Sequence, residues 1–303
     1  MDEGNIKRGF NVYLYYLVFP ALLVFFLINY YNVTFKIETL DINLMISVVT
    51  FLFGFLISIS FGMILSRVGA LKESLAGETG RLVSLYLLSE NLGSKFREKI
   101  ASRIDSYTIN TLRDYTNYNV GREAVYGMYD DIKYMEIKGE SQEASANSFL
   151  YIIGEFEPLR ERLEYLTSGK LLWATKLANY ILAFLLIGLL FLNRGDTFTN
   201  ALFIILSTTI VFILLIIEDY EDLRIGDYIV NISNSEQLFD LIGRDRYYPQ
   251  AILSRVKLEK GRIYRIGFYD KKAKQEKIVD IKYSPNFNSK INFLRRKMGY
   301  GKD

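Results

Sequence analysis

Five carboxylate residues crowd into the ten-residue stretch EDYEDLRIGD, which directly follows the last long apolar block: Glu218, Asp219, Glu221, Asp222 and Asp227. Carboxylate oxygens at such spacing can chelate a hard cation such as calcium, and Asp219, Glu221 and Asp222 are the candidate metal ligands. A helix dipole disfavours negative charge at a helix C-terminus, which argues against a simple cap. The spacing is not that of an EF-hand, however, and Arg224 can neutralise part of the cluster. A solvated acidic turn, or salt bridges to the basic tail, is the more ordinary interpretation.

A second pattern lies in the stretch GFLISISFG, where the small residues Gly54, Ser58 and Gly62 are four apart and share one helix face. In lipid, small residues let two helix backbones approach closely, and on this stripe alone such packing is the favoured interpretation. The same face could instead line a pore, with small residues giving width and apolar rings forming a constriction. The candidate pore-lining residues are Phe51, Gly54, Ser58 and Phe61.

The sequence excludes several kinds of chemistry. It contains no cysteine and no histidine, so disulfides, His-ligated haem, zinc fingers and Ser-His or Cys-His catalysis are ruled out. The phosphate-binding, dinucleotide-binding and hydrolase motifs are also missing, so we expect no enzyme. No nucleic-acid-binding motif is present either. Calcium at the acidic cluster is the one cofactor for which the sequence offers candidate ligands.

Four apolar blocks dominate the chain and must position these residues. They cover Val12 to Tyr31, Ile42 to Leu65, Leu171 to Leu192, and Phe198 to Ile217. Each reaches the length of about 20 residues that crosses a bilayer as a helix, and the only charge in any of them is Lys176. No small-residue cleavage site follows the first block, so we expect a retained anchor rather than a signal peptide.

Short linkers, residues 32–41 and 193–197, join the four blocks into two hairpins. Each linker holds one basic residue, whereas basic residues are frequent at the opposite ends of the blocks. The positive-inside rule therefore places the N-terminus, the middle segment and the C-terminus in the cytoplasm of a multi-pass cell-membrane protein.

The middle segment, residues 66–170, is predicted to be helical. Apolar residues of KFREKIASRIDSYTINTLRDY keep to one helix face, namely Phe96, Ile100, Ile104, Tyr107 and Leu112. We expect a second helix from Arg122 to Ile137 and a third from Phe149 to Thr167. The second and third apolar blocks are expected to continue beyond the bilayer as long helices.

The last 54 residues, Gln250 to Asp303, contain 15 Lys+Arg against 5 Asp+Glu. The stretches GRIYRIGFYD and EKIVDIKYS alternate polar and apolar residues, which predicts a β-hairpin followed by a short basic helix. The charge fits a solvated cytoplasmic domain or contact with anionic lipid headgroups.

The segment SRVGALKESLAGETGRLVSLY, together with the preceding LFGFLISIS, resembles bestrophin-like membrane proteins of a family described only as a domain of unknown function. The residues that carry the resemblance are Gly54, Phe55, Arg67, Glu78, Tyr86, Tyr115, Arg160, Arg162, Leu163, Trp173, Asp219 and Gly226. The similarity covers roughly residues 10–245. The chain departs from the family where Tyr220 stands in place of a common proline.

The resemblance implies four membrane helices and a homo-oligomer, a pentamer in bestrophin channels. It implies that the second span lines the pore, with Phe51, Gly54, Ser58 and Phe61 facing the axis, and that the acidic segment binds calcium. The residues Arg67, Glu78, Trp173 and Gly226 would be family-motif positions.

Together these observations predict an all-α membrane protein with four transmembrane helices in two hairpins, a helical cytoplasmic region and a small C-terminal β-hairpin tail. The expected divisions are residues 1–65, 66–170, 171–217, 218–249 and 250–303. The favoured function is an oligomeric ion channel, and the alternative is a membrane-anchored scaffold or signalling protein whose cytoplasmic helices bind partners.

Overall fold

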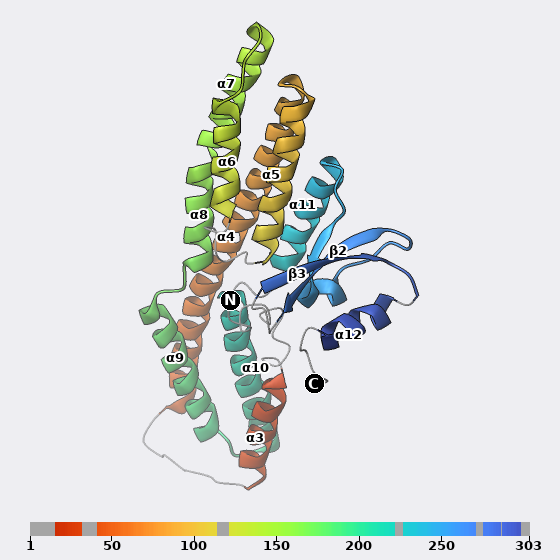
Figure 1. Ribbon diagram of the computed structural model, residues 1–303. Coiled ribbons are helices and arrows are strands. Elements are labelled where there is room, and N and C mark those ends of the chain that lie inside the picture. Colours follow the sequence, from red (N-terminus) through yellow and green to blue (C-terminus); the bar gives the residue numbers. More distant parts are fainter. Residues whose placement is uncertain are drawn as a thin grey trace. The chain divides into compact units, whose positions relative to one another are not determined.

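The computed structural model describes residues 16–31, 41–113, 121–221, 227–270, 275–285 and 287–297 of the 303-residue chain. The predictions that concern the start of the first apolar block, the linker at 32–40, Tyr115, Asp222, Arg224 and Gly226 lie outside these residues. The described chain is mostly helical and carries one small sheet (Figure 1).

The chain divides into two compact units. The apolar unit contains the described residues up to Ala70 and those from Gly169 to Glu221. The polar unit contains Leu71–Ser168 and the chain from Asp227 onward. The elements are α3 (Val18–Tyr30), α4 (Ile42–Asn91), α5 (Ser94–Arg113), α6 (Arg122–Lys133), α7 (Glu140–Gly154), α8 (Phe156–Ser168), α9 (Trp173–Leu192), α10 (Thr197–Glu221), α11 (Asp227–Leu241), β1 (Tyr247–Pro249), η2 (Gln250–Arg255), β2 (Ile263–Asp270), β3 (Gln275–Lys282) and α12 (Phe287–Lys297).

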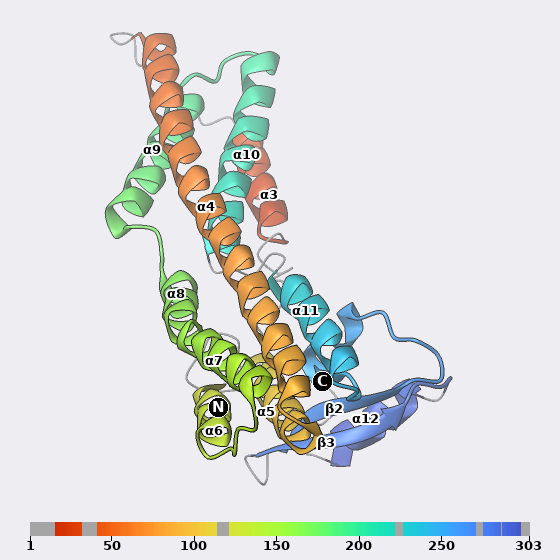
Figure 2. The same ribbon diagram turned by 90° about the horizontal axis from the view of Figure 1, so that it is seen from above.

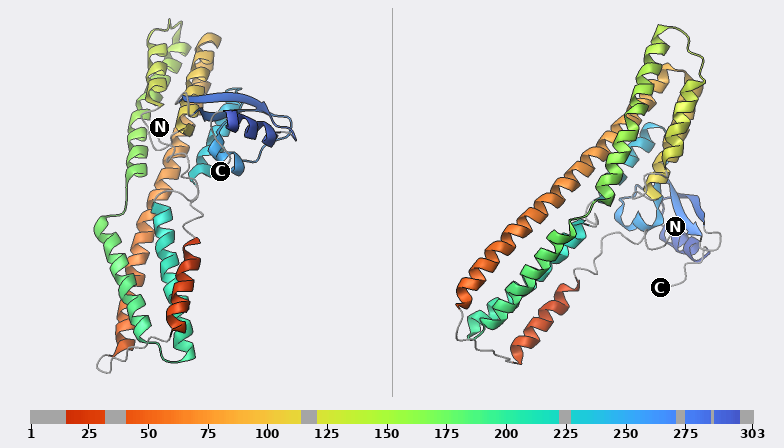
Figure 3. Two further views of the ribbon diagram at one scale, coloured as in Figure 1. Left: turned by 60° about the horizontal axis from the view of Figure 1, so that its bottom comes forward. Right: turned by 90° about the vertical axis from the view of Figure 1, so that its left-hand side faces the viewer.

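Three stretches of the described chain contain helix that is long and apolar enough to cross a membrane. They are Ile42–Asn91, Glu140–Leu192, whose apolar part is α9, and Thr197–Glu221. This supports a membrane protein. The described part of the first apolar block is α3, an apolar helix of 13 residues. Within the apolar unit α10 packs against both α3 and α9, and Figure 3 shows these three helices side by side in red, teal and green.

The two long helices expected from the sequence behave differently. Helix α4 runs unbroken for 50 residues, from the apolar block into the charged segment, as predicted. The prediction that the third span also continues from a cytoplasmic helix is wrong, because residues 169–172 are not helical and separate α8 from α9. Leu172 is extended, with φ −54° and ψ 132°. Gly169, a poor helix former, lies within this break.

The core of the polar unit forms where α4 meets α5, α6 and α7, which Figure 2 shows from above. The predicted apolar face of α5 is confirmed, since all of its members are buried: Phe96, Ile100, Ile104, Tyr107 and Leu112. The second predicted helix ends at Lys133, four residues early. The third begins at Glu140, inside the polar stretch, and is divided at Glu155 into α7 and α8.

The sheet has the order β1-β2-β3, and its antiparallel β2–β3 hairpin confirms the sequence prediction, as does the following helix α12. Strand β1 pairs in parallel with β2 and was not predicted.

One face of the sheet packs on α12, through buried residues such as Phe268 and Ile291. On β2, Arg265 makes a two-pronged ion pair with Asp105 of α5, with N–O distances of 2.5 and 2.7 Å.

Candidate functional site

The predicted pore-lining face of α4 is exposed along the chain's own surface. Phe51, Gly54 and Ser58 are exposed and Phe61 is half-buried. A Cβ atom placed on Gly54 or on Gly62 would meet nothing within 4 Å. The Ser58 hydroxyl donates to the Gly54 carbonyl at 2.8 Å, so its polar group is satisfied within the helix. Within the described part of the chain, no neighbouring helix fills the space beside these small residues.

The opposite side of α4 makes the contacts within the chain. Its buried row includes Phe53, Ile57 and Ile64, and between them Ser60 is fully buried. The Ser60 hydroxyl accepts a hydrogen bond of 2.7 Å from the side-chain amide of Asn179 in α9. Interhelical hydrogen bonds of this kind stabilise membrane helix pairs by about 0.6 kcal/mol on average. Packing within the chain thus uses Ser60 rather than Ser58.

The acidic segment is held by basic and amide groups of the apolar unit. The Lys176 ammonium lies 2.9 Å from a Glu218 oxygen and 2.7 Å from Glu221 Oε2. The Tyr180 hydroxyl donates to Glu218, and the Leu171 amide donates to Glu221 at 3.1 Å. From the sequence we expect salt bridges between this cluster and the basic tail. The described salt bridges instead join Glu218 and Glu221 to Lys176 of α9.

The two described candidate metal ligands, Asp219 and Glu221, are buried. Glu221 is 2% exposed and Asp219 is 1% exposed, both at the end of α10. Among the described residues, no group of three or more acidic side chains is arranged to hold a metal ion. The third candidate ligand, Asp222, lies outside the described residues. Calcium binding by Asp219, Glu221 and Asp222 therefore stays a prediction.

The described family-motif positions belong to both units, with Arg67 and Trp173 in the apolar unit and Glu78 in the polar unit. Arg67 donates to the backbone carbonyl of Glu221 at 3.0 Å, which fixes the end of α10 to α4. Trp173 is the first residue of α9 and is 70% exposed. Glu78 is buried in the polar unit, and Gly226 is outside the described residues.

Glu78 belongs to a buried polar cluster. The Tyr107 hydroxyl donates to its carboxylate, and the Arg160 guanidinium lies 5.3 Å from the centre of the Tyr107 ring. Burial raises the pKa of the Glu78 carboxyl, against the opposing influence of the Tyr107 hydroxyl and of Arg160. Gly121 closes the cluster, because a Cβ atom there would lie 2.6 Å from the Tyr107 ring and 2.8 Å from Arg160 Nη1.

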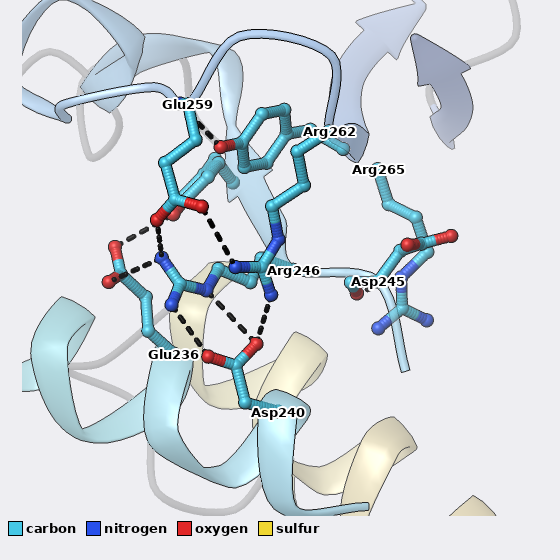
Figure 4. Close-up of polar contacts among 9 residues, drawn as sticks. Glu236, Asp240, Asp245, Arg246, Glu259, Arg262 and Arg265 are labelled. Atoms are coloured by element: carbon cyan, nitrogen blue, oxygen red, sulfur yellow. Dashed lines mark hydrogen bonds and ion pairs between the residues drawn. The ribbon is translucent and has the colours of Figure 1, made fainter. Parts of the chain in front are cut away.

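A second charged cluster joins α11 to the sheet (Figure 4). Arg246 pairs with Glu236 at 3.0 Å and with Asp240 at 2.6 Å. Arg262 pairs with Asp240 and, at 3.4 Å, with Glu259. Hydrogen bonds from Arg246 and Arg262 lower the pKa of the Asp240 carboxyl against its partial burial. Each of these charged side chains forms an ion pair within the protein. The cluster therefore holds α11 to the residues that precede β1 and β2.

Sequence reasoning identified Lys176, Glu78 and Arg160 singly but missed their partners. Lys176 was visible as the one charge in the apolar blocks, and a lone charge in such a block is expected to pair. That signal could have linked it to the acidic segment. The Tyr107 hydroxyl was hidden, because the residue also fits the apolar face of α5.

Comparison of the chain with protein-family models, with curated proteins and with solved structures finds no match.

Proposed function

We propose that the chain forms an oligomeric ion channel in a cell membrane, with α4 of each copy lining a central pore. In this proposal α3, α4, α9 and α10 span the bilayer as two hairpins, and both termini lie in the cytoplasm. The resemblance to bestrophin-like proteins suggests a pentamer and adds weight to a pore over simple packing.

The observation that carries the proposal is the exposed α4 face. Phe51 is 71% exposed, and among the described residues no atom lies within 4 Å of a Cβ placed on Gly54 or Gly62. A helix face with small residues is normally used where another backbone approaches closely. Because no helix of the described chain fills this role, a face between copies, or along an axis between them, accounts for the small residues.

The composition of the face suits a water-filled axis. Ser58 brings a hydroxyl to it, and Gly54 and Gly62 leave width. Phe51 lies one turn before Gly54 and stacks with Phe55 at a ring-centre distance of 6.5 Å. Apolar rings in a narrow pore can gate by dewetting, so Phe51 is the proposed constriction.

The test is Ser58→Trp, with the neighbouring exposed residue changed in Ile59→Trp as the matched control. Each purified protein is reconstituted in liposomes for ion flux, and its oligomer mass and melting temperature are measured in detergent. We expect the parent protein and Ile59→Trp to conduct. Ser58→Trp should keep its mass and melting temperature but lose flux, because the indole fills the axis.

Other outcomes contradict the proposal in distinct ways. A monomeric parent protein, or one that passes no ions, favours a membrane-anchored scaffold. If Ser58→Trp breaks the oligomer, the face packs helix on helix. If it conducts normally at unchanged mass, the face lies toward lipid.

A further inference from the structure

Strand β3 is the open edge of the sheet. It pairs with β2 along one side, and no described strand pairs with its other side. The Tyr283 amide donates to the Arg262 carbonyl on the β2 side at 2.9 Å. Since alternate residues of an antiparallel strand direct their backbone groups to the same side, Ile278, Asp280 and Lys282 direct theirs away from β2. Such a row of backbone groups is a template for another strand.

A groove of about 700 Å³ runs beside this edge, between β3 and α12. Its β3 side is formed by Val279 to Lys282, with Ile281 buried in the floor. Its α12 side presents Lys290 and Phe293, and Phe293 is 66% exposed. Backbone groups and an apolar groove therefore lie side by side, which is the arrangement that β-strand addition requires.

The stability of the unit does not explain the exposed ring. Helix α12 is already anchored to the sheet by Phe287 and Ile291, which belong to the buried cluster with Tyr264. Phe293 lies outside that buried row, and so does Ile278 at the edge of β3, which is 37% exposed. Charged residues that protect an edge strand from pairing are common, but they do not account for exposed apolar side chains beside it.

Charge selects among the possible occupants of the groove. Residues 271–297 contain nine Lys+Arg and two Asp+Glu. The described charged residues that line the groove are Lys282, Lys290 and Asp280, so the groove carries a net positive charge. A second copy would bring the same positive charge to this edge, so pairing between two β3 strands is opposed by repulsion. An anionic membrane would satisfy the charge, but it would use neither the backbone groups nor the groove. An extended acidic peptide would use the positive charge, the free backbone groups of β3 and the apolar groove.

We propose that the β3–α12 groove binds an extended acidic peptide of a partner protein, which adds a strand to β3 and places alternate apolar side chains beside Phe293. The backbone hydrogen bonds supply affinity, the groove selects the apolar side chains, and the lysines select the charge. The site shares no residue with the proposed pore, and its occupant is a soluble segment, so either proposal can fail without the other.

The experiment uses the full-length protein in neutral detergent and a fluorescent peptide that alternates glutamate and valine over the length of β3. We expect saturable binding by fluorescence anisotropy in the micromolar range. N-methylation of one alternate set of peptide amides should abolish binding, and N-methylation of the other set should leave it, because only one set can bond to β3. Equal effects of the two sets would overturn strand addition.

The protein side is tested with Phe293→Ala, which removes an exposed ring, and with Tyr151→Ala as a matched exposed aromatic on α7. Phe293→Ala should weaken peptide binding about tenfold, and Tyr151→Ala should have no effect. Far-UV circular dichroism confirms that both variants fold. Equal peptide binding by Phe293→Ala and the parent would overturn the proposal that the peptide lies in this groove.

Vesicles separate a peptide site from a basic surface. Phosphatidylserine vesicles that compete fully with the peptide, together with methylation-insensitive binding, would show a polyanion surface and overturn the proposal. No saturable binding of the peptide would also overturn it.

Discussion

Helix α4 is unbroken, but its two halves bury different fractions of their side chains. From Ile42 to Ala70 the buried side chains form a single narrow row that includes Phe53, Ile57 and Ile64. From Leu71 to Asn91 the buried face is wider. The exposed side chains of the first half are nevertheless mostly apolar. A narrow buried row with an apolar exterior fits a helix whose remaining surface meets lipid or another copy, whereas the second half follows the pattern of a water-soluble core.

The strongest test of this comparison pairs two core truncations, Leu85→Ala and Ile57→Ala. Leu85 is fully buried in the core of the polar unit, so its truncation should lower the free energy of unfolding of that unit by about 3–4 kcal/mol. Ile57→Ala should cost about 1 kcal/mol, because membrane helices gain little from hydrophobic burial against one another. Denaturant unfolding in detergent measures both values. Equal losses would mean that the first half is also packed as a water-soluble core.

A charge on the exposed surface probes the same comparison from outside. Phe55→Asp and Leu87→Asp change apolar residues that are similarly exposed, one in each half. An aspartate at the centre of a membrane helix costs about 2.5–3.5 kcal/mol on insertion scales. We therefore expect Phe55→Asp to reduce the membrane-inserted yield strongly, and Leu87→Asp to change it little. Membrane fractionation of the expressed proteins measures this, and two equal yields would contradict a lipid-facing or axial first half.

The smallest expected effect concerns Glu78, a buried carboxyl in the polar half of α4. Because burial raises its folded-state pKa, its contribution to stability is present below the unfolded pKa and is lost as the pH rises through the folded value. Glu78→Gln removes this dependence and keeps an acceptor for the Tyr107 hydroxyl. The melting temperature of the variant relative to the parent should therefore rise as the pH increases above 4.5, the ordinary pKa of a glutamate.

Glu90→Gln, which changes an exposed carboxyl of the same half, is the control variant. A melting-temperature difference that moves in the opposite direction for Glu78→Gln would mean that Glu78 is an ionised partner of Arg160.

Periodic patterns predicted the elements that depend on local sequence. The α5 face and the β2–β3 hairpin both follow from regular alternation of apolar residues. The break at residues 169–172 depends on distant groups, since Glu221 accepts the Leu171 amide 50 residues away. Strand β1 is three residues long and ends in Pro249, so it carries no pattern of its own.

The candidate site shows the same limit. Spacing correctly grouped Gly54, Ser58 and Gly62 on one face, because helix geometry alone decides this. Whether another helix of the chain covers that face depends on packing, which spacing does not specify. Likewise the acidic segment was evident, but its partner Lys176 is placed by the packing of α9 against α10.

The Asp105–Arg265 ion pair has a consequence for biosynthesis. Its members are 160 residues apart, and the polar unit is assembled from segments on both sides of α9 and α10. At about 5–20 residues per second, the ribosome reaches Arg265 roughly ten to thirty seconds after Asp105. Both later apolar helices leave the ribosome in that interval. The nascent chain must therefore hold α5 without its sheet partner throughout that time.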